Sequence, residues 1–169
     1  MPQPANTDER WMREALTEAR KAADRGEVPI GAVAVRSGKI VGRAHNVREQ
    51  TQNPLGHAEI LLVGKLAKKF KSWRLDGVTL YVTCEPCLMC AGAMLQARVP
   101  RVVYGCRDEK AGAMGTLYDL SNDPRLNHSI EVTAGVLESE CAAALSDFFR
   151  VLRNSRGRSD RPDEKTCKE

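Results

Sequence analysis

The chain has 169 residues and a net charge of +4, a length that suits one domain with its own core. No apolar run approaches the ~20 residues of a membrane span, and the N-terminus shows no secretory signal. We therefore expect a cytoplasmic protein with no membrane partner, in which thiols stay reduced and a mildly basic surface is compatible with RNA.

Hydrophobic periodicity predicts helices and strands in the order helix, two strands, helix, strand, helix, two strands, helix. Ser37 and Gly38 predict the turn of a hairpin between the first two strands. A polar loop is expected at 45–56, and a longer one at 107–128 with room for one short helix. The predicted helices are 6–26, 57–69, 87–98 and 139–153, and the predicted strands are 28–35, 40–44, 78–83, 102–106 and 130–136.

This element order predicts the fold class. Strand–helix–strand passages imply right-handed crossovers and parallel pairing, whereas the hairpin is antiparallel. We expect one α/β domain over residues 1–153, a three-layer α/β/α arrangement around a five-stranded mixed sheet. Residues 154–169 are charged and have little to bury, which predicts a disordered tail.

The stretch TCEPCLMCAG, residues 83–92, holds three cysteines and one proline. Pro86 suits the first position of a helix, so Cys87 and Cys90 share one face of its first turn. The helix N-terminus favours their thiolates. His57 begins the preceding helix. His57, Cys87 and Cys90 make three ligands, and three protein ligands with an open position are typical of catalytic zinc.

Glu59 lies two residues after His57, where its carboxylate can move a proton to and from a zinc-bound water. H-x-E combined with P-C-x-x-C is the signature of zinc-dependent nucleobase deaminases. Alternatives remain open at this point. Cys84 and Cys87 form a second C-x-x-C, which also fits a thioredoxin-like redox pair. That interpretation leaves His57 and Glu59 without a role. A cluster of buried cysteines without a metal is the other alternative, and it also gives these two residues no role.

Six stretches carry a family resemblance from about Glu9 to Arg153: VPIGAVAV, HAEI, TLYVTCEPCLMCAGAM, RVVYGCRDEKAGAMGTLYDL, NHSIEVTAGVL and ECAAALSDFFR. The sequence resembles the bacterial tRNA-specific adenosine deaminases, which have the cytidine-deaminase-like fold. The resemblance implies a cytoplasmic homodimer that converts the wobble adenosine of a tRNA anticodon loop to inosine. Both subunits contribute to the RNA-binding surface in that family, and no DNA partner is expected.

Carried over by residue, the resemblance implies that His57, Cys87 and Cys90 hold one Zn²⁺ per subunit. A zinc-bound hydroxide then attacks C6 of adenine with Glu59 as the proton shuttle. The residues that the resemblance implies for substrate binding are Asn46, Ala58, Asp108, Lys110, Phe148, Phe149, Arg150 and Arg153. The sequence departs from the family pattern at Leu55-Gly56, Cys84 and Leu152, and the last two departures bear on substrate fit or RNA affinity.

Helix periodicity gives its own interpretation of the residues proposed to contact RNA. Phe148 shares a helix face with Leu145 and Leu152, which predicts core packing. Phe149 lies about 100° further round the helix and is a better candidate for stacking on a base. Two rival functions stay open: a deaminase of free cytidine, deoxycytidylate or guanine, and a zinc-stabilised RNA-binding module without catalysis. Glu59 argues against the second, because a structural zinc site has no use for a free carboxylate.

Overall fold

The computed structural model describes the backbone of residues 5–159 and the side chains of residues 7–155. Five strands form one sheet in the order β2-β1-β3-β4-β5. β1 runs antiparallel to β2 and β3, whereas β3, β4 and β5 are mutually parallel. The predicted five-stranded mixed sheet is therefore confirmed. The strands are β1 (Gly31–Arg36), β2 (Lys39–His45), β3 (Val78–Cys84), β4 (Arg101–Cys106) and β5 (Glu131–Thr133).

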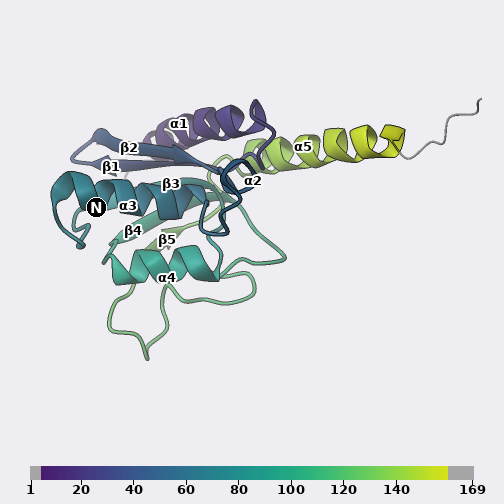
Figure 1. Ribbon diagram of the computed structural model, residues 1–169. Coiled ribbons are helices and arrows are strands. Elements are labelled where there is room, and N and C mark those ends of the chain that lie inside the picture. Colours follow the sequence, from purple (N-terminus) through teal and green to yellow (C-terminus); the bar gives the residue numbers. More distant parts are fainter. Residues whose placement is uncertain (1–4, 160–169) are drawn as a thin grey trace, which may run out of the picture.

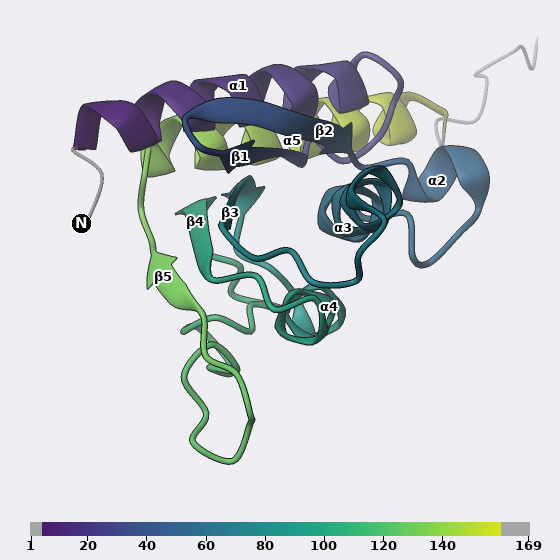
Figure 2. The same ribbon diagram turned by 90° about the vertical axis from the view of Figure 1, so that its left-hand side faces the viewer.

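Helices cover both faces of this sheet. The helices are α1 (Ala5–Ala23), α2 (Arg48–Thr51), α3 (Ala58–Phe70), α4 (Leu88–Gln96) and α5 (Glu138–Ser159). Figure 1 and Figure 2 show α1 and α5 on one face and α3 and α4 on the other. The three-layer α/β/α prediction is thus confirmed. Covering on both faces explains why β1, β3 and β4 are almost continuously buried.

The layer containing α1 packs closely against the sheet. A Cβ atom at Gly31 would lie 2.2 Å from the carbonyl oxygen of Ala15, so only glycine permits this approach of helix and strand. At the other end of α1, the buried carboxylate of Asp8 accepts a hydrogen bond from Tyr81 Oη at 2.8 Å. Arg101 binds the same carboxylate through two nitrogens, at 3.1 and 2.8 Å. These contacts tie α1 to β3 and β4.

Two predicted strands differ from the observed ones by more than one residue at an end. β1 begins at Gly31 rather than at 28, because Pro29 has no N–H to donate to a neighbouring strand and the amide of Ile30 bonds to the carbonyl of Val28 at 2.8 Å. β5 spans three residues instead of seven. Gly135 and Leu137 have φ angles of 82° and 53°, which turn the chain out of the sheet and into α5.

The short helix α2 lies inside the predicted loop 45–56 and was not expected. Its N-terminal amides at Glu49 and Gln50 donate to the carboxylate of Glu27, at 3.2 and 2.5 Å. This side chain comes from more than 20 residues earlier in the chain, so local signals did not predict the helix.

The start of α4 also differs from expectation. Cys87 is the N-cap residue and the helix begins at Leu88, so Pro86 lies outside the helix rather than at its first position. The carbonyl of Pro86 instead accepts a hydrogen bond from the amide of Ala113 at 2.9 Å.

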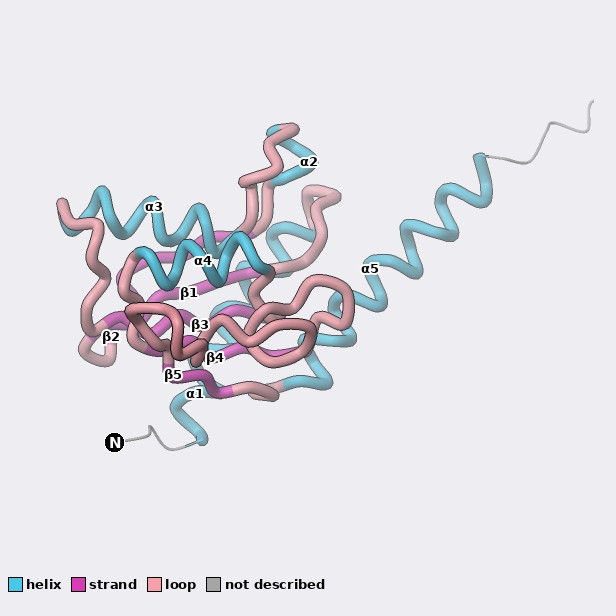
Figure 3. The backbone as a smooth tube through the Cα atoms, turned by 90° about the horizontal axis from the view of Figure 1, so that it is seen from below, coloured by secondary structure: helices cyan, strands magenta, loops and turns pink. Residues whose placement is uncertain are grey.

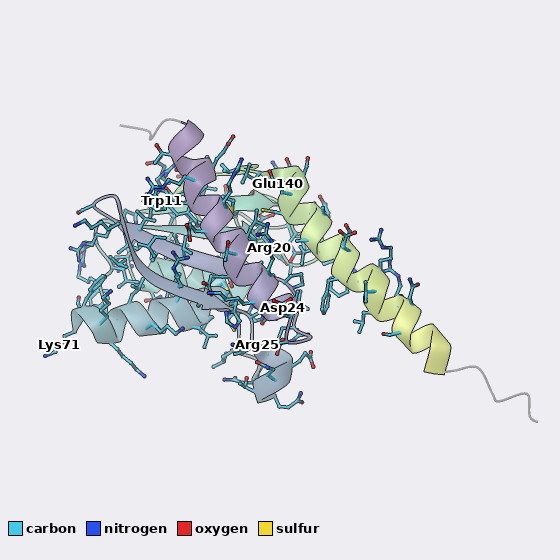
Figure 4. The ribbon with its side chains drawn as sticks, turned by 90° about the horizontal axis from the view of Figure 1, so that it is seen from above. Trp11, Arg20, Asp24, Arg25, Lys71 and Glu140 are labelled. Atoms are coloured by element: carbon cyan, nitrogen blue, oxygen red, sulfur yellow. The ribbon has the colours of Figure 1, made fainter. Side chains whose placement is uncertain are left out.

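The C-terminal half of α5 extends beyond the sheet (Figure 3). Figure 4 shows Glu140 near the sheet end of this helix, alongside α1. Cys141 is buried, but Phe148 and Leu152 are only half-buried because the helix has passed the edge of the sheet. The expectation that Phe148 belongs to the core is therefore wrong. α5 continues to Ser159, so the tail predicted from 154 is helical over its first residues, and residues 160–169 lie outside the described part.

Within the described residues, no helix has both the length and the apolar character needed to cross a membrane.

Candidate active site

The starts of two helices meet at one end of the sheet. His57 is the N-cap of α3 and Cys87 is the N-cap of α4, and both have extended backbone. Neither side chain bonds to the amides of its own helix, which is the usual task of an N-cap side chain. Both side chains are therefore free to point toward each other. His57 Nδ1 lies 3.7 Å from Cys87 Sγ and 3.5 Å from Cys90 Sγ.

These three residues fit a zinc ion. Their ligand atoms all lie within 4.8 Å of one another. Zinc–sulfur bonds of ~2.3 Å and zinc–nitrogen bonds of ~2.0 Å in a tetrahedron separate nitrogen from sulfur by roughly 3.6 Å, which agrees with both observed distances. The cluster contains no fourth protein ligand among the described residues. The sequence-predicted ligands are thus brought together in a geometry that suits zinc with an open position.

The local electrostatics favour a metal-binding thiolate. The hydrogen bond from Cys90, followed by the one from His57, lowers the pKa of Cys87 to about 4. Contact with Cys87 in turn raises the pKa of His57. The positive ends of the α3 and α4 dipoles also face this cluster, which supports negative charge there.

Glu59 occupies the first turn of α3 and is only 5% exposed. Burial raises the pKa of its carboxyl to about 7. An acid with a pKa near neutrality is well suited to accept and return a proton. Glu59 and His57 line the same cavity, so the proposed shuttle and a ligand of the proposed metal share one space.

This cavity has a volume of about 470 Å³, which is in the range of small-molecule sites. Its apolar walls include Val28, Ile30 and Leu145, and its charged residues include Arg48 and Arg107. The sequence-predicted site residues that line it are Asn46, His57, Ala58, Glu59, Cys87, Asp108, Lys110 and Phe149.

Four predicted site residues do not line the cavity. Cys90 is fully buried, within reach of His57. Phe148 packs edge-to-face on Phe149, with 5.5 Å between ring centroids. Arg150 forms an exposed ion pair with Asp147 at 2.9 Å. Arg153 is exposed on the projecting part of α5.

Sequence reasoning missed several residues around the cavity. Arg107 directly precedes Asp108, so its place after β4 was a usable signal. Arg48 had no such signal, because its position depends on α2 and hence on Glu27. Glu85 was also missed, although it lies inside the TCEPCLMCAG stretch.

Cys84 lies beside the site but is not one of the three residues of the His–Cys–Cys cluster. It pairs in register with Cys106 on the neighbouring strand, and it lines the cavity while being only 6% exposed. Contact with Cys106, together with burial, raises the pKa of the Cys84 thiol. Cys87 Sγ instead lies 3.7 Å from His57 Nδ1 in the cluster that suits zinc, so the redox interpretation of Cys84 and Cys87, which gives His57 no role, is not favoured.

Comparison with known proteins identifies the family. Residues 6–153 match the family model described as MafB19-like deaminase. The tRNA-specific adenosine deaminase of Bacillus subtilis is 53% identical over 149 residues, which cover 88% of this chain and 92% of that protein. This chain belongs to the tRNA-specific adenosine deaminase family.

Solved structures agree with this assignment to the deaminase family. A structure from studies of A-to-I editing by tRNA:A34 deaminases at the wobble position superposes with a TM-score of 0.77 and 40% identity, covering 80% of this chain and 99% of that one. A guanine deaminase from Nitrosomonas europaea gives a TM-score of 0.69 at 24% identity, with 83% of each chain covered. That second likeness shows a shared fold alone.

Proposed function

We propose that this deaminase converts adenosine to inosine at the wobble position of a tRNA anticodon, using one Zn²⁺ per subunit. One observation carries the chemical part: a buried glutamic acid, Glu59, shares a nucleoside-sized cavity with a His–Cys–Cys cluster of zinc-binding geometry. The names of the relatives support adenosine in tRNA as the substrate.

In this proposal His57, Cys87 and Cys90 hold the zinc ion. When bound, zinc lowers the pKa of a coordinated water from 15.7 to ~7 and so supplies a nucleophile at neutral pH. Glu59 takes a proton during attack at C6 and passes it to ring N1. It then takes the proton of the new C6 hydroxyl and donates it to the departing amine, so that the C6 carbonyl forms as the carbon–nitrogen bond breaks and ammonia leaves. The low exposure of Glu59 supports this role because it keeps bulk water from competing for the proton.

The cavity walls suggest how the RNA is held. An anticodon loop is already unpaired, so turning its adenosine into the cavity costs less than extrusion from a duplex. Asn46 is buried at the cavity wall and is proposed to bind the nucleoside. Phe149 is 40% exposed at the rim and is proposed to stack on a neighbouring base. Arg48 and Arg107 also line the cavity and suit contacts to flanking phosphates.

The cations assigned to RNA binding are proposed to contact the RNA beyond the target nucleotide. Lys110 lines the cavity, whereas Arg150 and Arg153 lie outside it on α5. A strand of RNA leaving the cavity past Phe149 would meet these cations on the projecting helix. Phosphate contacts of this kind position a nucleic acid without selecting its sequence.

A homodimer is part of the same proposal. Leu88 is 49% exposed although it follows the ligand Cys87, and Leu55 is 52% exposed just before His57. Leu117 is 51% exposed, and its amide bonds to Gly112, which forms a bridge with Cys87. These exposed apolar side chains therefore gather around the two helix starts. A second subunit covering them would explain their exposure.

The test is a deamination assay with purified protein and nucleoside analysis by mass spectrometry. The substrate is an anticodon stem-loop with adenosine at the wobble position. The matched control moves that adenosine to another loop position, and parallel reactions contain free adenosine, cytidine and guanine. Inosine from the first hairpin alone is the expected result. Turnover of a free base instead would retain the chemistry and reject the proposed substrate.

A further inference from the structure

Glu85 is a buried carboxylate that the chemistry above does not use. It follows β3 directly, two residues before the ligand Cys87, and is only 3% exposed. Its carboxylate accepts hydrogen bonds from the backbone amides of Asp108, Met114 and Thr116, at 3.1, 3.0 and 3.1 Å. It also accepts one from the hydroxyl of Thr116. All four donors belong to the loop that follows β4.

The loop is shaped closely around this one side chain. A Cβ atom at Gly112 would lie 2.5 Å from the Glu85 carboxylate, so a side chain there would displace either the loop or the glutamate. The amide of Ala113 bonds to the carbonyl of Pro86 at 2.9 Å, and Gly112 forms an antiparallel bridge with Cys87. The loop therefore wraps the segment that carries the metal ligand.

The same loop forms one wall of the cavity. Arg107, Asp108, Glu109, Lys110 and Ala111 all line it, whereas Glu85 does not. Asp108 is itself held in a tight turn, because its Oδ1 accepts the amides of Lys110 and Ala111 at 2.9 and 3.1 Å. Glu85 thus holds both ends of the segment 108–116, at Asp108 and at Thr116, without lining the cavity itself.

We infer that Glu85 is a positioning residue that sets the shape of the 107–116 wall and thereby the affinity for substrate. The inference rests on the proposed function, since that wall is where the RNA is expected to enter. A carboxylate is required because every partner is a donor, and an amide in its place would turn its own N–H groups toward them. The wall must be held in shape before binding, because a loop that is ordered only by the substrate lowers its affinity.

The experiment compares Glu85→Gln with Asp119→Asn. Asp119 holds the next part of the same connection by accepting the Ser121 amide at 3.1 Å, and it does not line the cavity. For Glu85→Gln we expect KM for the wobble hairpin to rise about tenfold or more, with kcat within threefold and one zinc per chain retained. Amide hydrogen exchange over 108–116 should accelerate about tenfold or more. Asp119→Asn should change neither KM nor exchange in that segment.

Several results would overturn the inference. These are an unchanged KM with normal exchange, a lower melting temperature with unaltered kinetics, or loss of zinc or of kcat without a rise in KM. If Glu85→Gln does not fold, Thr116→Val decides, because it removes one donor only and should raise KM about threefold. Failure of the parent protein to deaminate the hairpin would reject the proposed function. The exchange measurement would still test the role of Glu85 on its own.

Discussion

Asn46 donates a hydrogen bond from its side-chain nitrogen to Oε2 of Glu27 at 3.3 Å, and Glu27 has no exposed surface. The same carboxylate holds the first amides of α2. The buried side chain of Glu27 therefore orients Asn46, the residue proposed to bind the nucleoside, and also positions the segment that carries Arg48. A second nitrogen contact, to the carbonyl of Val28 at 3.4 Å, fixes the amide in the same direction.

Glu27→Gln should damage both functions of this carboxylate. The new amide nitrogen would face donors only, and an unsatisfied buried donor costs about 1–3 kcal/mol. We expect a fall in melting temperature of roughly 2–12 °C, together with a higher KM for the hairpin. The control is Glu49→Gln, whose exposed ion pair with Arg48 should contribute less than about 1 kcal/mol. Equal melting temperatures for both variants would contradict the prediction.

Glu59→Gln should lower turnover strongly without removing the metal. General acid–base catalysis contributes about 10²–10⁴-fold to rate, so kcat should fall by that range. Zinc content, measured by mass spectrometry of the native protein, should stay at one per chain because Glu59 is not a ligand. A variant that deaminates the hairpin at the parent rate would exclude Glu59 as the proton shuttle.

The raised pKa of Glu59 also predicts a pH-dependent stability of the metal-free protein. Burial moves this pKa from 4.5 to about 7 in the folded state, so folding favours the protonated acid. That stabilisation is complete below pH 4.5 and is lost as pH rises through 7. Each pKa unit is worth about 1.4 kcal/mol, which gives about 3 kcal/mol in total.

Glu59→Gln removes this loss of stability. The difference in the free energy of unfolding, metal-free variant minus metal-free parent, should therefore increase by about 3 kcal/mol between pH 4.5 and pH 8. Urea unfolding of both metal-free proteins at the two pH values measures the difference. A constant difference in the free energy of unfolding would show that Glu59 is not held in its neutral form.

Deamination should depend on the bound metal. A strong chelator is expected to abolish deamination, and added zinc should restore it. Cys90→Ser should lower the zinc content well below one per chain, because it removes a thiolate ligand. Cys141→Ser serves as the matched control, since that buried thiol lies beside Gly105 and outside the metal cluster. Zinc loss in both variants would point to general unfolding.

Asp8→Asn should destabilise the fold without altering the site. Arg101 keeps only 12% of its side chain exposed and would retain only the exposed carboxylate of Glu131, at 3.3 Å, as a counter-charge, so we expect a cost of up to about 3–5 kcal/mol. A fall in melting temperature of roughly 6–20 °C is expected, with KM for the hairpin unchanged. Tyr81→Phe removes one neutral donor from the same carboxylate and should cost only about 1 kcal/mol. Similar losses in both variants would argue against a buried charge as the cause.

Patterns of neighbouring residues predicted the features of this protein that depend on local backbone geometry. The spacing of Cys87 and Cys90 follows from the helical repeat, and their position beside Pro86 predicted a helix start within two residues of the observed one, Leu88. The pairing of that turn with His57 was also predictable, because both segments open helices beside one sheet. Strand ends at Pro29 and at Gly135 were misjudged, since the hydrogen bond from Ile30 to Val28 and the positive φ of Gly135 are not visible in the hydrophobic pattern.

The sequence by itself determined the fold class, the three candidate zinc ligands and the glutamate beside them, because helix periodicity and motif spacing are local properties. Only the tertiary structure decided which carboxylates hold the cavity walls. Glu27 and Glu85 act on amides more than 20 residues away, and such pairs have no signature in a single sequence. Their burial makes each hydrogen bond costly to lose, so the fold, rather than the local pattern, sets the shape of the site.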